Sequence, residues 1–170
     1  GFFGRSHVHL IKSSHMRSVL LLIVAVTLFS CSKDEFTDAP QIKFKRFDAN
    51  QASNFTTINS QPHIFLEVTD ANGDLGFKPG RDTAIIYLKN LFTNFVDSTL
   101  YFPDIGSAGK KNFKAEVSIG LFSVLGGRDL PFNQRPYADT LYFEIYIKDF
   151  AKNQSNVIVT TEPFIFHTLP

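Results

Sequence analysis

The chain has 170 residues, with 17 lysines and arginines against 16 aspartates and glutamates. The first 30 residues hold three of the basic residues and no acidic one, so the chain from Cys31 onward has a charge balance of −2. A body this close to neutral offers no basic surface for a phosphate backbone, which argues against nucleic acid as a partner. From Cys31 onward the chain has the size of one domain with a single core.

The first 30 residues are typical of an export signal preceded by foreign sequence. Residues 1–15 precede Met16, and we interpret them as a translated upstream segment that is not part of the native protein. Residues 16–30 contain Arg17, an apolar stretch from Val19 to Phe29 and the small residue Ser30. This layout predicts a signal peptide, and the apolar stretch is too short to span a bilayer.

Cys31 is the only cysteine, and it directly follows the apolar stretch. The segment Leu28-Phe29-Ser30-Cys31 resembles the lipobox of bacterial lipoproteins, although Phe29 departs from the small residue usual at that place. The resemblance implies that Cys31 carries lipid and anchors the protein to an outer membrane. The alternatives are an ordinary cleaved signal with a chance cysteine, or a buried cysteine. Residues 31–40 are polar, and we expect them to form a flexible tether.

From residue 41 onward, apolar and polar residues alternate with the period of two that is typical of β-strands. The alternation is clearest where the apolar residues of a segment would all lie on one face. We predict about seven strands, near residues 42–47, 64–69, 84–92, 99–102, 113–121, 141–148 and 156–161. Strands without intervening helical segments predict an all-β fold, and their number favours an immunoglobulin-like antiparallel β-sandwich over residues 41–170. Phe143 and Ile145 occupy the places of the corner tyrosine and the cysteine of immunoglobulin domains, so we expect neither the corner hydrogen bond nor a disulfide.

Three segments of the expected sandwich, "FLEVTDANGDLG", "IIYLKNLF" and "DTLYFEIYIKDFAKNQSNVIV", resemble an uncharacterised family of lipoproteins from Bacteroidota. Members of that family carry an acidic turn with glycines, an aromatic strand and a closing segment of the same kind. The resemblance implies an exported, lipid-anchored sandwich without an assigned activity. Residues 32–35, Ser-Lys-Asp-Glu, also resemble the acidic export signal of surface lipoproteins from the same group.

Two acidic loops form the candidate metal site. Asp70, Asn72 and Asp74 present side-chain oxygens at alternate positions of a glycine-containing turn, which is the kind of donor that Ca²⁺ prefers. The sixth and twelfth positions do not fit an EF-hand. In a sandwich, the loop containing Asp149 and Asn153 is expected at the same end. The alternative is that these residues only form hydrogen-bonded turns.

The sequence does not identify an enzyme. His63 and His167 are the only histidines after Cys31, and we expect one to open a strand and the other to lie near a fraying end. Glycine-rich phosphate loops and the serine-hydrolase turn are absent. We therefore predict a lipid-anchored binding or scaffolding domain with cell-envelope proteins or glycans as partners. The alternative is a surface hydrolase or accessory protein acting on glycans, for which Phe65, Tyr142 and Tyr146 could provide an aromatic platform.

Overall fold

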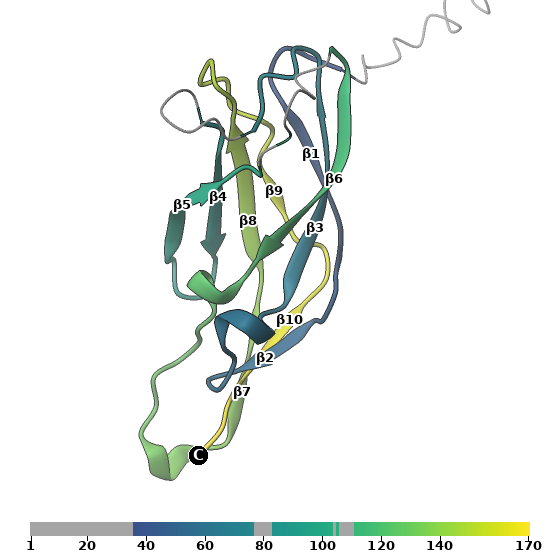
Figure 1. Ribbon diagram of the computed structural model, residues 1–170. Helices are drawn as coiled ribbons and strands as arrows, with labels where there is room; N and C mark the ends of the chain where they lie inside the picture. The colour runs from purple at the N-terminus through teal and green to yellow at the C-terminus, as the bar shows by residue number, and fades with distance from the viewer. Residues whose placement is uncertain (1–35, 77–82, 104, 106–110) are drawn as a thin grey trace, which may run out of the picture. The chain divides into compact units, whose positions relative to one another are not determined.

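The computed structural model describes residues 36–76, 83–103, 105 and 111–170 (Figure 1). The chain divides after Asp34 into two units, and every described residue belongs to the second. The expected signal peptide, Cys31 and residues 31–35 of the expected tether lie outside the described residues. Among the described residues, no helix is long and apolar enough to cross a membrane.

One layer of the fold is a three-stranded antiparallel sheet. Its strands, in the order in which they pair, are β1 (Gln41–Phe47), β3 (His63–Asp70) and β6 (Phe113–Gly120). In β3, Ile64, Leu66 and Val68 are buried, and they pair across the sheet with Ile119, Val117 and Ala115 of β6. The expected alternation is therefore confirmed, because the apolar face of each strand turns toward the core.

The second layer contains the remaining seven strands. A four-stranded sheet has the order β5 (Val96–Tyr101), β4 (Ile85–Asn90), β8 (Phe143–Lys148) and β9 (Ile158–Val159). A smaller sheet has the order β2 (Gln51–Ser53), β10 (Phe164–Thr168) and β7 (Tyr137–Leu141). β8 follows β7 directly along the chain, and β10 follows β9. β7 pairs antiparallel with β10, and β8 pairs antiparallel with β9, so the same two stretches of chain pair in both sheets. Figure 1 shows these two stretches side by side.

The predicted all-β sandwich is confirmed. The order of its strands is like that of immunoglobulin domains, with the three-stranded sheet β1-β3-β6 in one layer and the four-stranded sheet β5-β4-β8-β9 in the other. The described residues contain ten strands instead of seven. The strand expected at 141–148 is divided at Tyr142, and β2 has only three residues. The expectation that His167 lies near a fraying end was wrong, because β10 pairs with β2 on one side and β7 on the other.

One ring cluster joins the sheets, and one hydrogen bond fixes the chain between β6 and β7. The rings of Phe47, Phe143 and Phe164 contact one another edge to face, with centroids 5.4 to 6.3 Å apart, and each ring comes from a different sheet. Tyr137, at the start of β7, donates a hydrogen bond from its hydroxyl to the carbonyl oxygen of Arg128 at 2.6 Å. This bond is comparable to the corner bond of immunoglobulin domains. It was not expected from the sequence, because Phe143 occupies the usual place of the corner tyrosine and has no hydroxyl.

Candidate metal centre

The two acidic loops meet at one end of the sandwich. The first follows β3, which ends at Asp70, and the second follows β8, which ends one residue before Asp149. The backbone N–H of Phe150 donates to the carbonyl oxygen of Asp74 at 3.0 Å, so the loops are joined directly. The expectation that strand topology brings them to one end is therefore confirmed.

Three carboxylates converge where the loops meet. One oxygen each from Asp70, Asp74 and Asp149 can be chosen so that all three lie within 4.8 Å of one another. The side chains of Asp70 and Asp149 are fully buried, and Asp74 is half-buried. Oxygens that bind one Ca²⁺ lie about 2.3 to 2.6 Å from it, so two such oxygens are at most about 5 Å apart. The spacing of the three carboxylates therefore fits a single ion.

Some of the carboxylate oxygens already have partners within their own loops. Oδ2 of Asp70 accepts hydrogen bonds from the backbone N–H groups of Gly73 at 2.5 Å and Asp74 at 3.2 Å. Gly73 has a φ of +65°, a left-handed conformation that glycine adopts without strain. Asp149 accepts from the backbone and the side-chain amide of Asn153, at 2.8 and 2.9 Å. Asp70 and Asp149 thus also form the turns that were considered as the alternative.

Two oxygens remain without partners. Oδ1 of Asp70 and Oδ1 of Asp74 are both buried, and neither accepts a hydrogen bond from any residue within the described ranges. A buried carboxylate oxygen without a donor is unfavourable, by about 1 to 3 kcal/mol or more for a charged group. Hydrogen-bonded turns do not account for these two atoms, whereas a bound cation would, as would a proton shared between the carboxyl groups of Asp70 and Asp74.

The electrostatics of the cluster point the same way. Burial raises the pKa of Asp70 to about 6, and the negative charge of Asp74 adds to the rise, while the hydrogen bond from Gly73 opposes it. Burial and the charge of Asp149 raise the pKa of Asp74 above its ordinary value. Without a cation, this site favours protonated carboxyl groups, because several negative charges lie close together away from water.

The other two expected ligands, Asn72 and Asn153, lie away from the centre of the carboxylate cluster. The side chain of Asn153 is hydrogen-bonded to Asp149 at the edge of the cluster. Asn72 is exposed in its turn. Sequence spacing alone cannot distinguish these positions, because the direction of each side chain depends on how the turn closes.

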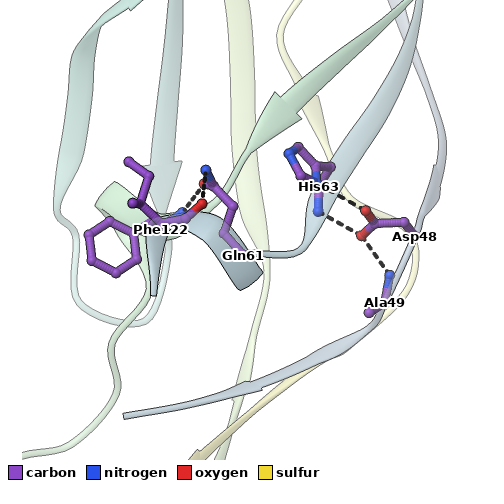
Figure 2. A network of polar contacts seen from close by, with 6 residues as sticks. Asp48, Ala49, Gln61, His63 and Phe122 are labelled. Atoms are coloured by element: carbon purple, nitrogen blue, oxygen red, sulfur yellow. Dashed lines mark hydrogen bonds and ion pairs between the residues drawn. The ribbon is translucent and has the colours of Figure 1, made fainter. Parts of the chain in front are cut away.

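A second polar site at the opposite end of β3 was not expected from the sequence. Nδ1 of His63 lies 3.0 Å from Oδ2 of Asp48, and the other oxygen of Asp48 accepts a hydrogen bond from the backbone N–H of His63 at 2.7 Å (Figure 2). Although burial opposes it, these bonds hold the pKa of Asp48 below its ordinary value. The pair lies beside a depression of about 400 Å³. The hydroxyl of neighbouring Ser60 is hydrogen-bonded with Thr57.

The three aromatic residues considered as a platform do not form one. The guanidinium of Arg46 covers the ring of Phe65, at 3.9 Å from its centroid, on the three-stranded sheet of β3. Tyr146 belongs to the other layer and stacks on Tyr87 with centroids 4.5 Å apart. Tyr142 lies between β7 and β8 and lines a separate depression.

Comparison with known proteins adds little to this geometry. No protein-family model matches the chain, and no curated protein matches it. Among solved structures, a selenomethionine-labelled beta-glucosidase from Kluyveromyces marxianus is similar with a TM-score of 0.31 and 8% sequence identity. The match covers 78% of this chain, which spans only 15% of the length of the beta-glucosidase chain. A likeness of this size supports no statement about fold or function.

Proposed function

We propose that the chain is a lipid-anchored cell-envelope protein of an outer membrane, and that its β-sandwich is a non-catalytic binding or scaffolding domain with a Ca²⁺ ion in the loops at one end. The observation that carries the binding role is the convergence of Asp70, Asp74 and Asp149 with two oxygens left without partners. Anchoring is supported by Cys31 at the end of an apolar stretch.

The donor set favours Ca²⁺ over transition metals. All three converging side chains are carboxylates, and hard oxygen donors on bent loops suit Ca²⁺, whereas zinc and copper sites usually include histidine or cysteine. Ca²⁺ takes six to eight oxygens, so Asn153, backbone carbonyls and water would complete its coordination. The ion would fix the two loops relative to each other, and loops at this end of a sandwich form binding surfaces in immunoglobulin variable domains.

Thermal unfolding with Ca²⁺ and with a chelator tests the cation site. An ion that binds only the folded chain stabilises it by about 2.7 kcal/mol at 100 times its Kd, so we expect the Tm to rise by about 5 °C or more. Asp74→Ala should abolish the rise. Asp129→Ala, which changes an exposed aspartate in a distant loop, should keep it. Equal Tm values with Ca²⁺ and chelator would show that the loops are plain turns.

Detergent phase partitioning tests the anchor. The wild-type chain should enter the detergent phase and carry lipid on Cys31, as read by mass spectrometry of the mature N-terminus, because several acyl chains hold a protein in a membrane. Cys31→Ala should stay in the aqueous phase. A wild-type chain that remains aqueous with an unmodified thiol would refute the anchor and leave the cation site untouched.

A hydrolase acting on glycans is the second candidate. The paired side chains of His63 and Asp48 beside a depression favour it, because an imidazole oriented by a carboxylate can act as a general base. Hydrolysis of a panel of aryl glycosides, lost in His63→Gln and kept in Asp74→Ala, would support this function over the first. Equal, negligible rates for the wild type and both variants would exclude hydrolysis of these substrates.

A further inference from the structure

The end of the sandwich opposite the carboxylates has a different character. Three loops meet there: residues 54–62 before β3, 91–95 after β4, with Val96 at the start of β5, and 121–127 after β6. We call these three loops together the uncharged end, because none of them contains an aspartate, glutamate, lysine, arginine or histidine; the paired side chains of Asp48 and His63 border the first loop. Residues 36–40 join the sandwich at the other end, where the carbonyl oxygen of Thr37 accepts from the N–H of Ala71.

The uncharged end exposes large apolar side chains. Each of six such residues has between 43% and 62% of its surface exposed; they are Phe55, Ile58, Phe92, Phe95, Val96 and Phe122. A fully exposed phenylalanine side chain offers about 150 to 250 Å², and isoleucine and valine offer somewhat less, so these six present roughly 550 Å² of apolar surface. This total is within the range of the largest apolar patch on a typical monomer, about 300 to 600 Å², and such patches often have a function.

Buried polar side chains hold the three loops together. Asn90 is fully buried, and its amide donates to the carbonyl oxygens of Val124 and Gly126 at 2.8 and 3.0 Å. Its side-chain oxygen accepts from the N–H of Phe92 at 2.9 Å, which ties the loop after β4 to the loop after β6.

A second amide makes the remaining link. Gln61 accepts from the N–H of Phe122 at 2.9 Å and donates to the carbonyl oxygen of Ile58 at 3.0 Å (Figure 2). At Gly120 a Cβ atom would overlap the side-chain amide of Gln61, so a larger residue there would displace this amide from its hydrogen bonds. Loops fixed in this way lose little conformational entropy when they bind a partner, which favours association.

We propose that the uncharged end is a self-association surface and that its occupant is a second copy of this chain. A twofold interface brings the same patch of both copies together, so a patch with charges of one sign would repel its copy, whereas an uncharged patch does not. A charged partner would leave its own charges buried and unpaired here. A membrane surface attracts lysine and arginine, which these loops lack.

The available area is sufficient for a dimer. Two copies facing each other through the six side chains would remove roughly 1,100 Å² from water, before the backbone and polar side chains of the loops are counted. Specific interfaces begin at about 1,000 Å² in total. A surface depression of about 250 Å³ between Phe95 and the segment 123–126 also offers space for a side chain of the second copy.

Thiol crosslinking of the full chain in its native membrane tests the proposal. Thr93→Cys places a thiol on an exposed residue of the uncharged end, and a short bis-maleimide should then yield a product of twice the monomer mass. Val157→Cys, at an exposed position outside the three loops, should yield at least fivefold less. The wild-type chain, whose only thiol is Cys31, shows any product that forms through that residue.

Second substitutions in the Thr93→Cys chain identify the surface. Phe95→Asp should reduce the crosslinked dimer at least fivefold, whereas Val157→Asp should leave it unchanged, and the Tm of both should match that of the single variant. An equal yield from Thr93→Cys and Val157→Cys would overturn the proposal, as would a product whose mass includes a different protein. A chelator should leave the dimer intact, so failure of the cation site and failure of self-association give different results.

Discussion

The carboxylate of Asp70 is fully buried, and only one of its two oxygens is hydrogen-bonded by the described residues. Its pKa is raised to about 6, mainly by burial, compared with about 3.8 in the unfolded chain. The cation-free folded state therefore binds more protons than the unfolded state between about pH 4 and pH 6. By linkage, stability is highest below pH 4 with respect to this group and falls as the pH rises toward 6.

Asp70→Asn should remove this pH dependence. The amide keeps an oxygen that can accept from Gly73, and it has no negative charge to be buried beside Asp74 and Asp149. With chelator at pH 7, the variant should be more stable than the wild type by up to about 3 kcal/mol, the equivalent of a shift of about two pKa units. Urea unfolding at pH 4, 5, 6 and 7 measures this.

The outcome that would contradict the argument is a variant that unfolds at lower urea concentration than the wild type at pH 7 with chelator. That result would mean that Asp70 stabilises the turn more through its charge than it destabilises the cluster. In the presence of Ca²⁺ the order should reverse, because the neutral amide of the Asp70→Asn variant is a weaker ligand than the carboxylate. Asp129→Asn, which changes an exposed carboxylate, should leave both pH profiles unchanged.

At the scale of single residues, the sequence predicts which residues of the cation site come together. It does not predict how their side chains are oriented. Asp70, Asp74 and Asp149 could be predicted to meet because the ends of two strands in a sandwich lie together. The exposure of Asn72 could not, because it depends on the conformation of a few turn residues. The contact of His63 with Asp48 joins residues 15 positions apart across a chain turn and has no spacing signature.

At the scale of elements, the strands with regular alternation were predictable and the short ones were not. β3, β6 and β8 have their apolar residues on one face, and this pattern identified them. β2 has three residues, and it forms because β10 offers a parallel edge to which it can pair. That edge is a tertiary feature without a local signal.

The connection between β4 and the loop after β6 depends on Asn90. Its side chain makes two hydrogen bonds as donor and two as acceptor, so its polar atoms are satisfied although they are buried. Asn90→Ala would leave several backbone groups without partners, each at a cost of about 1 to 3 kcal/mol unless water replaces the amide. We expect the free energy of unfolding to fall by about 3 kcal/mol, measured by urea unfolding.

Asn133→Ala is the matched control for this prediction, because Asn133 is exposed in the loop before β7. It should change the free energy of unfolding by no more than about 0.5 kcal/mol. A similar small change in Asn90→Ala would show that water replaces the amide and that the loops need no such link. The crosslinking yield at Thr93→Cys should also fall in Asn90→Ala if the uncharged end must be held rigid to associate.

At the scale of the whole described domain, the three sheets share one core. Phe47, Phe143 and Phe164 come from the three sheets, and their rings contact one another edge to face. Loss of any one sheet would expose the ring surfaces of the other two. We therefore expect the domain to unfold in one cooperative transition, in spite of its division into three hydrogen-bonded sheets.

Phe143→Ala tests this cooperativity. Truncating a buried phenylalanine costs about 3 to 5 kcal/mol, a large part of the stability of a domain of this size.

The chain has no tryptophan, so fluorescence follows its tyrosines, and Tyr87 and Tyr146 report on the four-stranded sheet. Far-ultraviolet circular dichroism reports on all strands. Because the core is shared, both signals should move to lower urea together in the variant, with midpoints that coincide as in the wild type. Phe132→Ala, which truncates an exposed ring outside the uncharged end, should leave both midpoints nearly unchanged. If tyrosine fluorescence shifted while circular dichroism kept part of its signal at higher urea, the four-stranded sheet would be unfolding separately, and the phenylalanine contacts would not couple the layers.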